Sequence, residues 1–391
     1  MEELDFEKLF KLQMVCMKIN LCHPDTKINK YWVLKNMIAF TPYTISISLL
    51  INCITYCMRR NDYFNAFKSG VPVIFWVSMK LNFFFLIKKR SKLRYLIDCM
   101  KDDYSKALAM DNKRREVIEE YSDRGRKVLL FWGYLMVCTV GMFLLKSMFL
   151  TVYHSKRNGE LRLYSFFDMH YPFNIRELRV YNKLYFFVSY FIEMYFTSKS
   201  ALIFFCTIPL GPIFMLHICG QLELVKMKFE KVFENDNTDD ILKDIVQKLQ
   251  YIYSFVGEIN DCLMFIYEVM LKQNILLLPF TSHAIIQSIK RGEITAEFLG
   301  ILLQSIITSS IPCYYGDLLM QKGEELRDAA YNCGWECVHK PKARKTLLII
   351  MTRALRPVAI QSIFSTICLD TLTEVYSQGY TIFNLMSAVI D

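Results

Sequence analysis

Residues 362–390 read SIFSTICLDTLTEVYSQGYTIFNLMSAVI and form the last long apolar stretch of the chain. At helical spacing one face of this stretch collects, in order, Asp370, Glu374, Gln378, Ile382, Leu385 and Val389. A helix rises about 1.5 Å per residue, so this stripe is about 28 Å long, close to one hydrocarbon thickness of a bilayer. A face that is acidic at one end and apolar at the other suits an ion pore with a cation-attracting vestibule and a hydrophobic gate. A membrane helix whose polar residues face other helices has the same pattern, and the stripe alone leaves both interpretations open.

The composition of the whole chain is that of a membrane protein. Of 391 residues, 53% are hydrophobic, which is more than a soluble globular domain usually carries. Long apolar runs recur near 33–58, 66–88, 128–152, 184–216, 255–289, 294–320 and 346–390. Because proline cannot continue the helical hydrogen bonds, we expect the last run to break near Arg356-Pro357 and its spanning helix to begin near Ser362. The pattern predicts an all-α protein with seven transmembrane helices.

The distribution of basic residues predicts the orientation of the chain. The segments expected on the side of the N-terminus hold 30 of the 47 Lys and Arg residues, and those on the other side hold 11. The positive-inside rule therefore places the N-terminus in the cytoplasm and the C-terminus outside, which is opposite to G-protein-coupled receptors. The acidic N-terminus is unlike a signal peptide. The net charge of +9 follows from the basic flanks of the spans and does not require a nucleic-acid partner.

Two segments outside the apolar runs also have helical periodicity. Apolar residues recur three or four positions apart in 88–127 and in 217–254, which predicts amphipathic helices that extend the spans into the cytoplasm. Such helices need a partner for their apolar faces, so we expect a cytoplasmic bundle that could also hold subunits together. A folded loop with no role in assembly is the alternative.

No motif in the chain indicates catalysis or a cofactor. Cys333, Cys337 and His339 are close in sequence, but a fourth ligand is missing and the expected compartment is reducing, so we predict no metal site. The sequence contains no G-x-S-x-G, H-E-x-x-H or phosphate-binding glycine loop. An enzyme is therefore the weakest interpretation.

The C-terminal region resembles one family. Residues 328–389 read DAAYNCGWECVHKPKARKTLLIIMTRALRPVAIQSIFSTICLDTLTEVYSQGYTIFNLMSAV, with Trp335, Arg356-Pro357 and Tyr376 ahead of the run 379–386. This region resembles the C-terminal signature of insect odorant receptors, whose last helix carries a Ser-Tyr-Ser-Tyr-Phe-Thr-Leu-Leu-like run. The related gustatory receptors, which are the alternative, carry a Gln-Phe pair near the end of their motif, and this chain lacks that pair. The arginine and N-P-x-x-Y motifs of G-protein-coupled receptors are also missing at the corresponding spans.

The resemblance implies a subunit of a ligand-gated, non-selective cation channel in the plasma membrane of olfactory sensory neurons. In this family a tuning subunit, which binds a small volatile organic ligand, assembles with a co-receptor subunit into a heterotetramer within membrane lipid. The resemblance is to a tuning subunit, because the loop before the fifth span is short. It implies a pore lined by the last helix, with its gate at Leu385, Val389 and Ile382. The vestibule would then be formed by Asp370, Glu374 and Gln378. Pairing of the two carboxylates with Arg353 or Arg356 is the alternative.

The family's ligand pocket lies in the outer half of the bundle, within one subunit. The residues expected at that depth are Phe75, Met79, Phe143, Ser147, Tyr190, Met194, Leu302 and Ser305. An odorant pocket should be mainly apolar and aromatic, although ordinary core packing would select the same residues. Lys146 and Glu193 are ionisable at the same depth and are expected to pair, unless one of them faces a ligand. This organisation divides the chain into a six-span bundle, 1–320, and a region of anchor helices and pore helix, 321–391.

Overall fold

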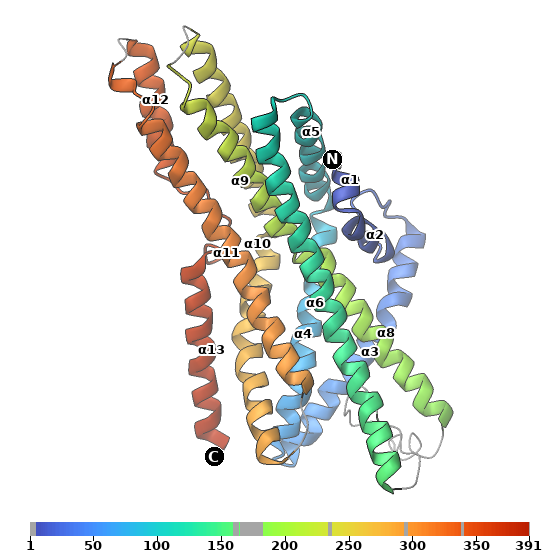
Figure 1. The fold of residues 1–391 in the computed structure, drawn as a ribbon. Helices are drawn as coiled ribbons and strands as arrows, with labels where there is room; N and C mark the ends of the chain where they lie inside the picture. The colour runs from blue at the N-terminus through green and yellow to red at the C-terminus, as the bar shows by residue number, and fades with distance from the viewer. Residues whose placement is uncertain are drawn as a thin grey trace.

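The computed structural model describes residues 5–158, 164, 183–233, 237–292, 296–337 and 340–390. All regular elements within these residues are helical, apart from one isolated bridge between Gln361 and Thr366. The elements are α1 (Phe6–Leu9), α2 (Lys11–Ile19), α3 (Lys30–Arg59), α4 (Tyr63–Lys88), α5 (Arg90–Ala107), α6 (Asn112–Asn158), α8 (Lys183–Thr207), α9 (Leu210–Phe229), α10 (Thr238–Lys290), α11 (Ala296–Tyr331), the 3-10 turn η1 (Trp335–Cys337), α12 (Pro341–Ala354) and α13 (Leu369–Ile390). They form one elongated bundle (Figure 1). The prediction of an all-α fold is confirmed.

Six stretches of the described chain are long and apolar enough to cross a membrane. They are α3, α4, α6, the consecutive pair α8 and α9, α10, and α11. The remaining long helix near the C-terminus, α13, lies beside α11 in the lower half of the bundle (Figure 1). Its 22 residues reach about 33 Å, enough for one bilayer. The apolar runs of the sequence therefore correspond to helices, and α13 supplies the seventh.

Local signals explain where the first spanning helices begin. The Asn29 side chain caps α3 by accepting a hydrogen bond from the Trp32 backbone N–H at 2.7 Å, and Asp62 caps α4 in the same way through Asn65. Pro42, Pro72, Pro279 and Pro312 lie inside helices. Membrane helices tolerate such prolines because neighbouring helices and hydroxyl side chains satisfy the freed backbone groups.

Several helices are too long for a bilayer alone and continue into a second layer. About 20 residues span the hydrocarbon core, whereas α6 has 47 residues and α10 has 53. Their upper parts in Figure 1 surround α9 together with α5 and α11. Nearly every residue of α9 is buried, as expected for a helix that is apolar on all sides. The helices predicted in 88–127 and 217–254 are thus present, the first divided between α5 and α6 and the second between α9 and α10.

The start of the last helix differs from the expectation. We expected the spanning helix from Ser362, but α13 begins at Leu369. Residues 362–365 form a tight turn instead, because the Ser362 hydroxyl donates to the Ser365 carbonyl and accepts from the Ser365 N–H. A serine side chain that bonds to nearby backbone competes with the helix. The fourth span also differs, since it breaks at Ile208-Pro209 into α8 and α9.

The connector between α12 and α13 is held against the bundle. The Asn260 side chain on α10 donates to the Ala359 carbonyl at 3.2 Å and accepts from the Gln361 N–H at 2.9 Å. At Gly316 on α11 an added Cβ would lie 2.0 Å from the Ile367 carbonyl oxygen. Only glycine allows the connector to approach α11 this closely, two residues before α13 begins at Leu369.

Candidate ligand pocket and candidate channel face

A small cavity lies between α4, α6, α8, α10 and α11. Its volume is about 60 Å³, and its lining is mainly apolar. Of the residues predicted for a pocket, Phe75, Phe143 and Ser305 line this cavity. Trp76 also lines it and packs edge-on against Phe196, with ring centroids 3.8 Å apart.

The other residues predicted for the pocket lie elsewhere in the bundle. Met79 is fully buried in the main core, and Leu302 is half-buried. The Ser147 hydroxyl donates to the Tyr164 carbonyl at 2.7 Å. Tyr190 and Met194 pack around the cluster that contains Trp76 and Phe196. None of these side chains lines the 60 Å³ cavity.

Two glutamine side chains give the cavity its polar character. Gln273 on α10 is 4% exposed and Gln304 on α11 is 7% exposed, and both line the cavity. Their side-chain amides make no hydrogen bond to any residue that the structure describes. The Thr197 and Thr308 hydroxyls, by contrast, bond to backbone carbonyls of their own helices. An amide that is buried without a partner costs free energy, so both glutamines are suited to bond to a molecule in the cavity.

These glutamines were not among the expected pocket residues, although the sequence carries a signal for them. Gln273 and Gln304 interrupt apolar stretches of α10 and α11, and polar residues at membrane depth usually face the interior or a cavity. The expected pocket residues were aromatic and aliphatic, with Ser147 and Ser305 as the polar members. Without the packing, nothing showed that the two amides point into one space.

An ion pair joins the cavity walls. The Lys146 ammonium on α6 bonds to the Glu297 carboxylate on α11, and the two side chains are 15% and 2% exposed. Phe143 and Ile301, about one turn away on the same helices, line the cavity. The expected pairing of Lys146 with Glu193 is therefore corrected: Lys146 pairs with Glu297, because α11 and not only α8 faces this side of α6.

The exposed face of α13 carries most of the predicted channel residues. Asp370, Glu374 and Gln378 are exposed, and so is Leu385, at 63%. The opposite face packs on α10, where Gly379 lies close enough that an added Cβ would be 3.5 Å from the Leu278 Cβ.

Ile382 differs from its neighbours on the stripe. Its side chain is half-buried and packs against the main core. Val389 belongs to α13, but its side chain lies outside the described part of the chain.

The acidic end of α13 carries two exposed carboxylates, those of Asp370 and Glu374. Neither Asp370 nor Glu374 forms an ion pair with a side chain that the structure describes. The Arg353 guanidinium instead lies over the Tyr253 ring, 4.1 Å from its centroid. The expected alternative, in which Arg353 pairs with one of the two carboxylates, is therefore not seen among the described residues.

Comparison with known proteins decides the family. The family model described as 7tm Odorant receptor matches residues 64–380, which is most of the chain. This chain belongs to the odorant receptor family. The matched region of this odorant receptor runs from α4 into α13 and includes the cavity, the Lys146–Glu297 pair and both glutamines. The family consists of ligand-sensing channels and not of enzymes.

Individual relatives agree with this assignment. Odorant receptor 67c of Drosophila melanogaster is 23% identical over 316 residues, which cover 77% of this chain and 74% of the relative. Odorant receptor 2a of the same species is 32% identical over 95 residues, about a quarter of each chain.

The fold is similar to that of a solved insect olfactory receptor. The structure of OR5 from Machilis hrabei in complex with eugenol has a TM-score of 0.79 at 15% identity, covering 98% of both chains. The OR5 structure without eugenol has a TM-score of 0.78 at 16% identity, covering 97% of both chains. At this identity the likeness concerns the fold alone.

Proposed function

We propose that this receptor is the tuning subunit of an odor-gated, non-selective cation channel. It would assemble with an odorant co-receptor subunit, as a heterotetramer, in the plasma membrane of olfactory sensory neurons. The observation that carries the proposal is the face of α13, which runs from Asp370 and Glu374 to Leu385 and is exposed on the single subunit. Such a face is costly in lipid but suits a water-filled axis shared by several subunits.

The proposed pore has two parts along α13. Asp370, Glu374 and Gln378 would line the cytoplasmic vestibule, where negative charge raises the local concentration of cations. Leu385, with Val389 and Ile382, would form the gate, because a narrow ring of aliphatic side chains stops ions by excluding water. This arrangement requires a cytoplasmic N-terminus, which the excess of basic residues on that side supports.

The proposed ligand is a small, mainly apolar volatile molecule with an oxygen function. The cavity would surround it with Phe75, Phe143 and Ser305, and the amides of Gln273 and Gln304 would bond to its oxygen. The solved complex of OR5 with eugenol, an oxygenated aromatic molecule, supports this ligand class. At about 60 Å³ the cavity is smaller than the ~150 Å³ that admits benzene elsewhere. Binding must therefore push its walls apart.

Expansion of the cavity could move the proposed gate through the helices that the two share. Its walls include α10 and α11, and both helices pack on α13. The Tyr376 hydroxyl on α13 lies 2.9 Å from the Ser310 hydroxyl on α11, and Gly379 packs against Leu278 on α10. We infer that a ligand that displaces α10 and α11 moves α13 with them and widens the ring of Leu385 side chains.

Whole-cell recording tests the proposal. Cells that express this chain, with or without an insect odorant co-receptor, would be exposed to a panel of volatile compounds. We expect a rapid, odor-evoked cation current only when both subunits are present. Current from this chain alone would contradict the need for a partner. Silence in both, with surface expression verified and with Leu385 substitutions that cause no leak, would contradict the channel role.

A further inference from the structure

A second, larger groove lies on the outside of the bundle, away from the ligand cavity. Its volume is about 640 Å³, and it lies between α6, α11 and the first residue of α13. Arg124 and Lys127 line one end, and Phe131, Tyr314 and Leu369 line the remainder. We propose that this groove binds an anionic phospholipid, with its phosphate at the two basic side chains and an acyl chain along the apolar wall.

The position of the groove along α6 supports this occupant. The helix is highly charged up to Lys127, and residues 128–145 carry no charge before Lys146. Lys127 therefore marks the level at which α6 enters the hydrocarbon. On α11 the uncharged run from 298 ends at Asp317, so Tyr314 and Tyr315 lie at the same boundary. Tyrosine is enriched at this level, where headgroups meet acyl chains.

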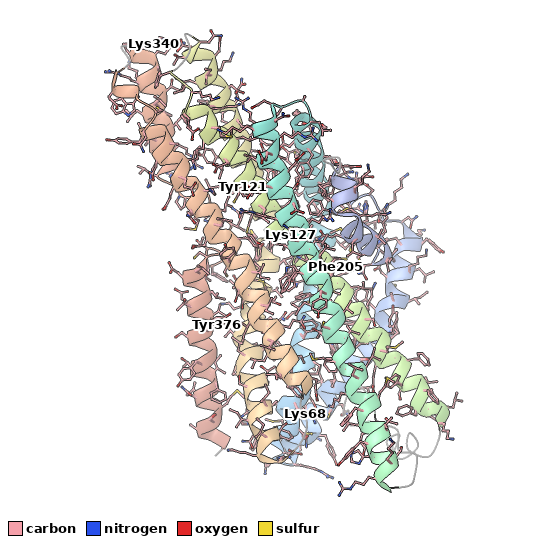
Figure 2. The ribbon with its side chains drawn as sticks, in the orientation of Figure 1. Lys68, Tyr121, Lys127, Phe205, Lys340 and Tyr376 are labelled. Carbon is pink, nitrogen blue, oxygen red and sulfur yellow. The ribbon has the colours of Figure 1, made fainter. Side chains whose placement is uncertain are left out.

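The side chains along the groove change from basic to apolar, as a phospholipid changes from a charged headgroup to acyl chains. Beyond Lys127, α6 continues with an exposed apolar face on which Phe131 is 42% and Tyr134 is 71% exposed. A phosphate at Lys127 would leave an acyl chain lying over these side chains. Figure 2 labels Lys127 on α6, with α11 between it and Tyr376 of α13. The groove thus combines paired cations at its headgroup end with an apolar wall at membrane depth.

The two basic side chains are accessible to a ligand. Arg124 pairs with Glu120, and Lys127 pairs with Asp123, at distances of 2.5 and 2.7 Å. Both pairs join exposed residues one turn apart, and such pairs contribute little to stability. A phosphate that is shared by both cations and partly removed from water would compete well for them. Anionic lipids concentrate in the cytoplasmic leaflet, the side that our proposed orientation gives this end of α6.

Native mass spectrometry of the full-length receptor tests the proposal without measuring current. The protein, extracted in mild detergent, would be offered phosphatidylserine, phosphatidylcholine with the same acyl chains, or inorganic phosphate. We expect retention of phosphatidylserine over phosphatidylcholine, with no displacement by millimolar phosphate. In the double variant Arg124→Gln, Lys127→Gln this preference should fall about tenfold or more, because each basic residue near an anionic headgroup contributes severalfold.

A matched control lies at the other end of the same helix. The double variant Lys156→Gln, Arg157→Gln removes the same charge from exposed positions on α6 and should keep the lipid preference. Equal retention of the two lipids by the unmodified receptor, or an unchanged preference in the groove variant, would overturn the proposal. Displacement by inorganic phosphate would assign the groove to a free anion. Loss of the oligomer in the groove variant would make it a subunit contact.

The outcome is distinguishable from that of the proposed function. A receptor that retains phosphatidylserine but conducts no odor-evoked current would keep the lipid site and contradict the channel role. A receptor that conducts odor-evoked current but shows no preference for phosphatidylserine would support the channel role and contradict the lipid site.

Discussion

At the scale of single residues, buried polar side chains in the membrane half of this receptor show where its chemistry lies. Lys146 and Glu297 neutralise each other across α6 and α11. The amides of Gln273 and Gln304 line the cavity and make no hydrogen bond to a described residue. Burial of a charge is tolerated only when the charge is paired, whereas an unpaired amide can form its hydrogen bond to a bound ligand. The first pair is therefore structural, and the two glutamines are the candidates for recognition.

Replacing Lys146 with Met should reduce folding rather than alter tuning. The substitution leaves the Glu297 carboxylate buried without a counter-charge, which costs about 3–5 kcal/mol. Surface labelling should show a clear loss of receptor, and the second change Glu297→Gln should restore much of it. Lys156→Met, on an exposed part of the same helix, is the control. Normal surface expression with a shifted odor profile would count against this assignment.

Replacing Gln273 or Gln304 with Leu should weaken responses to oxygenated ligands. A hydrogen bond contributes about 0.5–1.5 kcal/mol net, so the concentration for half-maximal current should rise up to about tenfold. Responses to hydrocarbon ligands of the same size should stay unchanged. Gln287→Leu, on α10 but outside the cavity lining, is the matched control. An equal change for both ligand classes would indicate altered packing instead.

At the scale of elements, α13 has two faces with different partners. Thr371, Val375 and Gly379 pack inward, whereas Asp370, Glu374 and Leu385 are exposed. Because a helix has 3.6 residues per turn, the two sets separate cleanly around its axis. The exposed set is the one that can line a pore shared with other subunits.

Replacing Leu385 with Ala should increase the unstimulated current of the complex. A smaller side chain widens the proposed apolar ring and lets water and ions enter without odor. This leak is measured as whole-cell current in the absence of ligand. The current should disappear when the permeant cations are replaced by impermeant ones. Met386→Ala, which changes a half-buried residue of the same turn, should leave the baseline low. Equal baselines for the two variants would argue against a gate at Leu385.

At the scale of the whole molecule, the receptor consists of a membrane layer and a second layer of helix extensions. A buried polar cluster joins α5, α9 and α10 in the second layer. Its centre is the Asp103 carboxylate, which lies 3.1 Å from His217 Nε2 and 3.4 Å from Lys248 Nζ and accepts a hydrogen bond from the Tyr251 hydroxyl at 2.8 Å. Burial raises the pKa of Asp103, but the hydrogen bond from His217 and the charge of Lys248 outweigh it, so its pKa lies below the ordinary value.

This cluster predicts sensitivity to acid. A carboxyl whose pKa is lowered by folding stabilises the folded state above its unfolded pKa of 3.8, and that stability is lost as the pH falls through the lower folded value. The temperature at which the purified receptor begins to unfold should therefore fall below about pH 4. Asp103→Asn should cost about 3 kcal/mol at pH 7 and flatten the acid dependence, because a buried pair is broken. Asp102→Asn, on the exposed side of α5, should do neither.

Apolar periodicity and charge predicted the helical fold, the helical extensions and the mixed stripe of the last helix, because these are local properties of the chain that do not depend on which residues are neighbours in space. Three of the expected ligand-binding residues, Phe75, Phe143 and Ser305, line the cavity, and their contact with a ligand stays a prediction. Packing alone brings Gln273 and Gln304 to one cavity and pairs Lys146 with Glu297, and the folded connector makes α13 begin at Leu369. These features depend on which helices are neighbours and on how the connector folds, and residues distant in sequence meet only through packing.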